Sequence, residues 1–147
     1  MSGYFATDDQ PFTDDGWLRT GDLGALDEQG HLHVDCRRSD LIVTGGENVY
    51  PAEVEAAVAS LPGIRAACVF GVLDAAWGQV VAVALVPLDP ADPPDAAALH
   101  AGFERLLASH KRPRRIIFVD ELPTTPSGKL RRSEAQRSFH RAVKELL

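Results

Sequence analysis

The spacing of hydrophobic and polar positions divides the sequence into two parts. In the first part, short apolar runs at residues 17–20 and 32–34 flank the turn-forming stretch 27–30. This pattern predicts a small β-meander that ends near Cys36. Residues 1–10 show no periodicity, and we expect them to form an exposed segment belonging to something larger.

Four apolar runs in the second part predict β-strands. They cover residues 41–44, 64–70, 80–86 and 115–119 and are rich in β-branched side chains. The two middle runs lack polar alternation along their length. Their pattern indicates a sheet that is covered by helices.

Three helices are expected between and after these strands. Pro51 is tolerated at the first position of a helix, Asp95 can cap the second helix, and Ser133 with Gln136 forms a capping-box pattern for the third. Apolar residues then recur at helical spacing: Val54, Ala57, Val58 and Leu61 in the first helix, Leu99, Phe103 and Leu106 in the second, and Phe139, Ala142, Val143 and Leu146 in the third. The whole pattern predicts an α+β fold, with a small β-meander appendage followed by a compact mixed-sheet domain with three helices.

The composition is that of a folded domain with a local excess of positive charge. Hydrophobic residues make up 45% and charged residues 24% of the 147 positions, as in an average globular protein. The net charge of −6 gives no reason to expect nucleic acid. The cations gather instead in the last third of the chain, which favours a small anionic ligand: Lys111, Arg112, Arg114, Arg115, Lys129, Arg131, Arg132 and Arg137.

Several classes of site and location are disfavoured by the residues present. Cys36 and Cys68 lie far apart without a second pair or a flanking histidine at metal-ligand spacing, so we expect neither a metal site nor a disulfide framework. No apolar run approaches the roughly 20 residues that span a bilayer, and the N-terminus lacks a signal-peptide pattern. We therefore expect a cytoplasmic protein that does not enter the membrane.

Two stretches carry residues suited to a nucleotide. Asp22 ends a glycine-containing run, where a carboxylate can accept hydrogen bonds from a vicinal diol such as a ribose; an ordinary turn residue is an equally good interpretation. Residues 37–51 combine charges with the pair Gly45-Gly46, which lets backbone approach a ligand closely. Solvated charges beside a simple turn are the alternative there.

Two further stretches are suited to phosphate. Lys129 follows a glycine in the Pro-flanked loop 123–128, so its ammonium can be delivered to a phosphate. The loop is not a Walker motif, because the first glycine and the following hydroxyl are missing. Residues 110–115, together with Trp77, offer arginines that fork onto phosphate and an indole that stacks on a base. For both stretches the simpler alternative is a solvated basic surface, beside a core tryptophan in the second case.

The order and spacing of four stretches resemble the end of the adenylate-forming superfamily, which contains acyl-CoA synthetases, peptide-synthetase adenylation domains and luciferases. The stretches are GWLRTGDLG (16–24), CRRSDLIVTGGENVYPAEVE (36–55), DAAWGQ (74–79) and LPTTPSGKLRR (122–132). The residues around the Gly-Gly pair are nearest to medium-chain, aryl- and succinylbenzoate-CoA ligases. The resemblance implies an ATP-dependent acid-CoA ligase, in which an acid and MgATP give an acyl-adenylate and coenzyme A then displaces AMP to form a thioester.

The resemblance also implies a role for each matching residue. Lys129 would be the catalytic residue, reaching the carboxylate and α-phosphate oxygens during adenylation. Asp22 would hold the ribose hydroxyls of AMP, Arg37 would contact the nucleotide, and Arg38 and Ser39 would form a hinge about which the C-terminal domain swings between the two half-reactions. The residues implied to contact coenzyme A are Gly46, Glu47, Trp77, His110, Arg112 and Arg114.

Three positions depart from the family pattern. Cys36 stands where a glycine commonly precedes the nucleotide-contacting arginine, and Ser39 stands at a hinge position that is often Asp or Lys. His110 replaces an aromatic residue, so we expect no ring stacking at that position.

The implied organisation is residues 1–37 as the end of a large N-terminal domain, 38–39 as the hinge, and 40–147 as the C-terminal α+β domain. The family's phosphate loop and acyl pocket belong to the N-terminal domain and have no counterpart in this sequence. We therefore expect the isolated chain to be inactive in adenylation, with ATP and Mg held mainly by an N-terminal partner domain that also binds the carboxylic acid. The alternative is a free-standing module, derived from such a ligase, that binds coenzyme A or docks on a partner.

Overall fold

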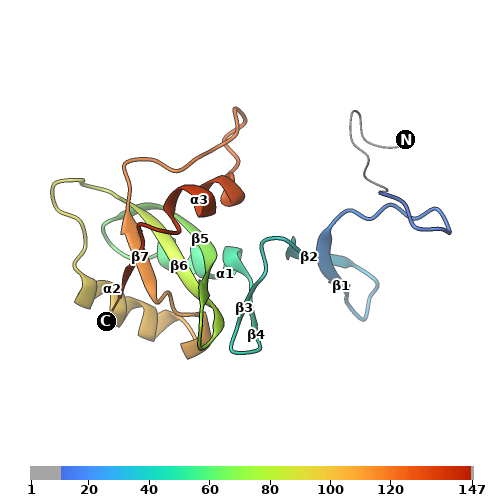
Figure 1. Ribbon diagram of the computed structural model, residues 1–147, viewed down its shortest axis with the longest axis horizontal. Helices are drawn as coiled ribbons and strands as arrows, with labels where there is room; N and C mark the ends of the chain where they lie inside the picture. Colours follow the sequence, from blue (N-terminus) through green and yellow to red (C-terminus); the bar gives the residue numbers. More distant parts are fainter. Residues whose placement is uncertain (1–10, 147) are drawn as a thin grey trace. The chain divides into compact units, whose positions relative to one another are not determined.

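The computed structural model describes residues 11–146, so the expectation for residues 1–10 lies outside the described range. The chain divides into two compact units, and the first ends at Ser39 while the second begins at Asp40 (Figure 1). Each unit is described by itself below. Among residues 11–146, no helix is both long enough and apolar enough to span a bilayer.

The first unit is built on an antiparallel hairpin. Strand β1 (Asp22–Leu26) pairs with β2 (Leu32–Arg37), and the Gly30 amide closes the connecting turn on the Asp27 carbonyl at 3.0 Å. The strand predicted at residues 17–20 is wrong apart from one bridge between Phe12 and Leu18. Its backbone instead bonds within a local loop, where the Thr13 amide donates to the Trp17 carbonyl at 2.8 Å.

In the described part of the second unit, residues 40–146, the chain forms a six-stranded mixed sheet. The neighbours run β4-β3-β6-β7-β8, and β5 lies off this path and pairs antiparallel with β6 along its length. Among the strand pairs that the structure describes, β6 and β7 alone are parallel. The strands are β3 (Ile42–Thr44), β4 (Glu47–Val49), β5 (Ile64–Asp74), β6 (Gly78–Pro87), β7 (Arg115–Phe118) and β8 (Lys144–Glu145). The predicted mixed sheet is confirmed, and β4 and β8 are additions to it.

Within residues 40–146, three α-helices cover the sheet, as predicted. They are α1 (Pro51–Ala59), α2 (Ala96–Leu106) and α3 (Arg132–Phe139), and a short 3₁₀ turn, η1 (Ser109–Lys111), follows α2. Pro51 starts α1 at the position where its missing N–H costs nothing. The Asp95 carboxylate caps α2 by accepting the Ala98 amide hydrogen at 2.7 Å.

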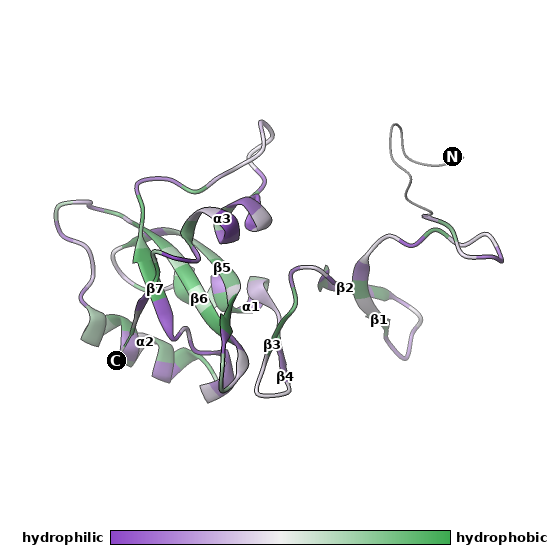
Figure 2. Cartoon of the chain, viewed as in Figure 1, coloured by the Kyte–Doolittle hydropathy of each residue, from purple (hydrophilic) through white to green (hydrophobic). Residues whose placement is uncertain are grey.

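Alternate residues of the central strands form a core on each face of the sheet. On one face Val81, Val83 and Leu85 pack with the buried residues of α1 and α2. On the other face Ala82 and Ala84 pack with Ala135 of α3. Small side chains on this second face let the helix approach the sheet closely. The strands β5 to β7 accordingly carry the most hydrophobic colouring of the second unit (Figure 2).

Two helix boundaries differ from the prediction. In α2 the buried residue after Phe103 is Leu107, whereas Leu106 is 40% exposed; the helix ends at Leu106, and Leu107 turns inward as its C-cap. The third helix starts at Arg132 rather than after a Ser133 cap. It ends at Phe139, because the residues that follow leave the helix and pair with β7 as strand β8.

Candidate functional site

A tight hairpin presents Lys129. Thr124 bridges to Leu130, and the Gly128 amide donates to the Thr125 carbonyl at 2.8 Å. Gly128 has a φ of 82°, a left-handed conformation that glycine adopts without strain. The turn is therefore closed by the Gly128 amide and followed by a left-handed residue, which explains why a glycine stands at position 128. None of the ion pairs among residues 11–146 involves the exposed Lys129 ammonium.

The tip of the Lys129 hairpin is held by hydrogen bonds among its own polar groups. The Thr125 hydroxyl accepts the Lys129 amide hydrogen at 3.0 Å and lies 2.9 Å from the Ser127 hydroxyl. The Thr125 amide donates to the Lys129 carbonyl at 2.8 Å. The lysine side chain is therefore a charge on a preformed support, free to meet an anion.

A second cationic surface forms around Trp77. The Arg114 guanidinium carbon lies 4.3 Å from the centroid of the Trp77 ring, a cation–π contact. Below the ring lies Gly45, where an added Cβ would come within 2.7 Å of the indole. Gly45 and Gly46 both have positive φ, 57° and 85°, and reverse the chain between β3 and β4. We call Gly45, Gly46, Trp77 and Arg114 the indole face.

Three of the residues implied to contact coenzyme A lie outside the indole face. Glu47 starts β4 and is exposed beside the Gly-Gly turn. His110 lies in η1, which is held to α1 by an ion pair between Lys111 and Glu53 at 2.6 Å. Arg112 donates from Nε to the Leu107 carbonyl at 3.0 Å and pairs with Glu104 at 3.2 Å. Its guanidinium thus caps the end of α2, a role that the sequence did not suggest.

The two residues implied to contact the nucleotide lie opposite each other in the first unit. Asp22 and Arg37 are cross-strand partners in the β1–β2 hairpin. The Arg37 Nε lies 3.4 Å from an Asp22 carboxylate oxygen, with 69% and 37% of the two side chains exposed. Arg38 follows directly, and its amide donates to the Gly21 carbonyl at 2.8 Å.

Comparison with known proteins now places these motifs in a family. The profile of the AMP-binding enzyme C-terminal domain matches residues 53–129, more than half of the chain. The chain belongs to the family of AMP-binding enzyme C-terminal domains. The resemblance to adenylate-forming CoA ligases that the four motifs indicate is thereby confirmed.

The curated relatives of this C-terminal domain are CoA ligases. The 2-succinylbenzoate–CoA ligase of Geobacillus kaustophilus is 54% identical over 122 residues, which are 83% of this chain and 25% of the relative. The indoleacetate–CoA ligase of Aromatoleum aromaticum is 42% identical over 84% of this chain and 24% of the relative. The chain thus spans about a quarter of the length of these relatives.

Solved structures resemble the C-terminal domain closely. ATP-bound MatB from Rhodopseudomonas palustris has a TM-score of 0.77 and 38% identity, over 88% of this chain and 26% of that one. The o-succinylbenzoate CoA synthetase of Bacillus subtilis, in complex with its acyl-adenylate intermediate, has a TM-score of 0.75 and 44% identity, over 86% and 25%. The predicted fold class is confirmed by this agreement.

A buried ion cluster of the C-terminal domain was not anticipated from the sequence. Arg132 donates to an Asp40 carboxylate oxygen at 2.6 Å, to both Glu55 oxygens at 3.0 and 2.9 Å, and to the Val69 carbonyl at 3.0 Å. Burial alone would lower the pKa of Arg132, but Glu55 and Asp40 outweigh it and hold this pKa above its ordinary value. Cys68 lies in the same surroundings, and its burial, followed by the charge of Glu55, raises its pKa to about 12.

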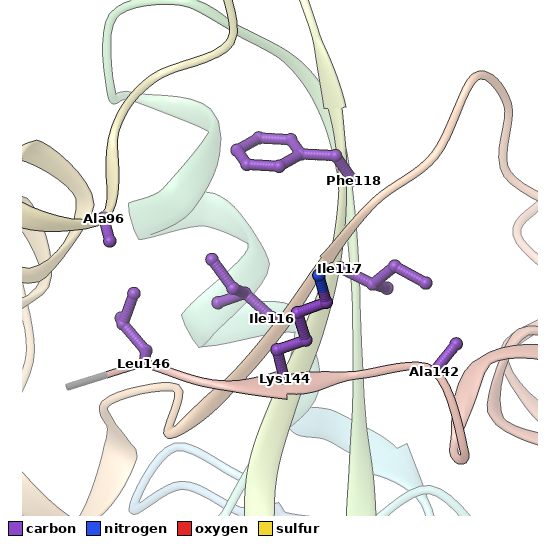
Figure 3. A pocket seen from close by; sticks show the side chains of 7 residues that line it. All are labelled: Ala96, Ile116, Ile117, Phe118, Ala142, Lys144 and Leu146. Atoms are coloured by element: carbon purple, nitrogen blue, oxygen red, sulfur yellow. The ribbon is translucent and has the colours of Figure 1, made fainter.

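Cavities of the C-terminal domain separate into polar and apolar ones. A recess of about 380 Å³ is lined in part by Arg112 and Arg114. A second, mainly apolar recess of about 430 Å³ lies between β7, the start of α2 and the last residues, and contains none of the proposed site residues (Figure 3). Its lining residues are Ala96, Ile116, Ile117, Phe118, Ala142, Lys144 and Leu146.

Proposed function

We propose that this chain is the C-terminal part of an ATP-dependent acid-CoA ligase, which forms an acyl-adenylate and then an acyl-CoA thioester. The observation that carries the proposal is Lys129, an exposed ammonium on a preformed hairpin, in a chain whose relatives are CoA ligases. The proposal includes an N-terminal domain that holds the acid and most of the ATP with Mg, and a cytoplasmic location.

The described residues suit the co-substrates in two places, at Lys129 and on the indole face. The Lys129 ammonium would neutralise charge that develops on carboxylate and phosphate oxygens during adenylation. The indole face offers an exposed ring and a guanidinium, which suit the base and phosphates of coenzyme A. At Gly46, an added Cβ would meet nothing within 4 Å, so there is space for the pantetheine arm beside the turn.

Asp22 and Arg37 would serve the nucleotide from the first unit. Their cross-strand pairing puts an acceptor for ribose hydroxyls beside a cation. Within residues 11–146, no group of three or more His, Cys, Asp or Glu side chains is arranged to hold a metal. In this proposal magnesium enters with ATP and is held by the N-terminal domain.

The division into two units supports a hinge at Arg38 and Ser39. The first unit ends at Ser39, so a change of backbone dihedrals there would turn the second unit as one body. In this proposal Lys129 is presented for adenylation and the indole face, together with Glu47, His110 and Arg112, for thioester formation. Of these last three, Arg112 would have to leave its contacts at the end of α2.

The proposal is tested by grafting. The chain replaces the matching quarter of the Geobacillus 2-succinylbenzoate–CoA ligase, and ATP–pyrophosphate exchange and CoA thioester formation are measured. We expect the graft to support both reactions and the isolated chain to support neither. A graft that folds yet performs no half-reaction would contradict the proposal, and tight CoA binding by the isolated chain in that case would favour the free-standing module instead.

A further inference from the structure

The Arg132 cluster joins four segments that are far apart in the sequence. Asp40 is the first residue of the second unit, Glu55 lies on α1, Val69 lies in β5, and Arg132 is the first residue of α3. About four-fifths of each charged side chain is buried, since 19%, 19% and 17% of Arg132, Asp40 and Glu55 remain exposed. Charges buried to this degree need close and well-oriented partners.

This cluster adjoins the base of the Lys129 hairpin. Arg132 follows Lys129 by three positions, and the intervening Arg131 amide donates to the Pro123 carbonyl at 2.9 Å. The hairpin is thus closed immediately before the residue whose guanidinium is fixed. The Arg132 side chain therefore connects the Lys129 hairpin with Asp40, the first residue after the boundary between the two units.

Helix stability alone does not explain an arginine at this position. A cation in the first turn opposes the helix dipole, and the N-cap Arg131 supplies no side-chain cap for α3. The helix has a separate polar tie to the sheet one turn later, where the Gln136 side-chain Nε2 donates to the Gly71 carbonyl at 2.8 Å. The Arg132 guanidinium instead donates its hydrogen bonds to residues outside the helix.

We propose that Arg132 is a positioning residue that couples the Lys129 hairpin to Asp40. When the backbone turns at Arg38 and Ser39, Lys129 then moves together with Asp40. The role in adenylation rests on the proposed ligase function, whereas the mechanical coupling does not. The Arg132 hydrogen bonds and the Trp77–Arg114 contact have no residue in common, so we expect the coupling to serve adenylation and to spare thioester formation.

The coupling is tested on the chain itself by amide hydrogen exchange, which needs no ligase activity. Arg132→Gln is expected to speed exchange at Gly128, at Arg131 and at residues 40–42 by about tenfold or more. Gln136→Ala is the matched control, because it removes the other tie between α3 and β5, and it should leave both regions unchanged. Unchanged exchange at either region in Arg132→Gln would overturn the proposal.

A neutral variant separates positioning from folding. Arg132→Met combined with Asp40→Asn and Glu55→Gln removes every charge of the cluster, and such replacements often preserve stability. If this variant keeps the wild-type Tm yet exchanges as fast as Arg132→Gln at both regions, the coupling is supported. If the triple variant instead exchanges as slowly as the wild type at the hairpin and at residues 40–42, the charges of the cluster do no more than neutralise one another. That result would overturn the proposal.

In the grafted ligase, Arg132→Gln should lower kcat for adenylation by about 10- to 100-fold, the scale of a small misplacement of a catalytic group. KM for ATP, and the rate of thioester formation from supplied acyl-adenylate, should change less than about twofold. Equal loss in both half-reactions would overturn the adenylation role. An inactive wild-type graft would contradict the proposed function, and the exchange experiment would still decide the coupling.

Discussion

The guanidinium of Arg114 lies over the Trp77 ring at 4.3 Å, and the ring in turn covers Gly45. The indole is therefore held between a cation and a backbone turn, with 43% of the residue still exposed. An aromatic side chain fixed in this way loses little freedom when a base stacks on it. Its orientation depends on glycine at position 45, where any larger residue would collide with the indole.

The first prediction concerns this face. Trp77→Ala should weaken CoA binding, and Arg114→Ala should weaken it about two- to fivefold, the scale of one exposed cation–π contact together with its charge. Gly45→Ala should also weaken binding, because the new methyl group displaces the ring. Isothermal titration calorimetry with CoA measures the affinity of each variant, including Trp77→Ala, which lacks the indole. Unchanged affinity in all three variants would remove the indole face from the CoA site.

The second prediction concerns Lys129. In the grafted ligase, Lys129→Ala should raise the adenylation barrier by about 3 kcal/mol, the scale of one preorganised charge contact. Thioester formation from supplied acyl-adenylate should be retained. The hairpin itself should persist, because its bonds come from Thr125, Ser127 and backbone groups. Lys144→Ala, another exposed lysine of the second unit, is the control and should leave both half-reactions unchanged; equal damage from both variants would refute a specific role.

The sequence predicted the elements whose signals are local. Pro51 and Asp95 mark helix starts that the structure confirms, because both act through the first turn of their own helix. Strand β4 was missed because Glu47-Asn48-Val49 has no apolar alternation. It exists because Gly45 and Gly46, both with positive φ, reverse the chain and bring Val49 opposite Ile42. A Gly-Gly pair is a recognised hairpin signal, so strand β4 could have been predicted from the sequence.

The residues that were missed act through distant partners. Arg132 bonds to Asp40, Glu55 and Val69, which are 92, 77 and 63 positions away. Nothing in the spacing of charges along the chain distinguishes such an arginine from a solvated one. Arg112 could likewise be assigned to phosphate from its position in a basic run, but only the folded chain brings it back to the carbonyls that end α2.

The third prediction separates these two roles of Arg112. Arg112→Ala should lower the free energy of unfolding by about 1–2 kcal/mol, because the Leu107 carbonyl and Glu104 lose their donor. The Arg105→Ala variant, which removes an exposed arginine in the last turn of the same helix, is the matched control and should change stability little. Urea unfolding of the isolated chain measures both. Wild-type stability of Arg112→Ala would instead leave CoA binding as the function of this side chain.

The fourth prediction concerns the boundary at Ser39. Trypsin should cut after Arg37 or Arg38 before it cuts inside the sheet domain, since both arginines are exposed and hinge backbone must deform. A fragment that begins near Ser39 should accumulate and resist further cleavage, as followed by mass spectrometry. Ser39→Pro in the grafted ligase should then impair one half-reaction more than the other. Cleavage spread evenly over the chain would argue against a hinge at this position.

The last prediction concerns Cys68, whose thiol is fully buried between β5 and α3. Burial, followed by the negative charge of Glu55, raises its pKa from 9.0 to about 12. At pH 8 only about one thiol in ten thousand is then ionised, so iodoacetamide should modify the partly exposed Cys36 first and Cys68 only after unfolding.

The same shift gives Cys68 a pH dependence with a definite sign. Above pH 9.0 the unfolded chain loses the thiol proton while the folded chain keeps it up to about pH 12. The folded state therefore binds more protons in this range, and its stability should fall by up to about 1.4 kcal/mol per pH unit. Cys68→Ala should remove this contribution, so urea unfolding of the two proteins from pH 8 to 11 should show a difference that grows with pH in favour of the variant. Parallel stability curves would show that the Cys68 thiol ionises alike in both states.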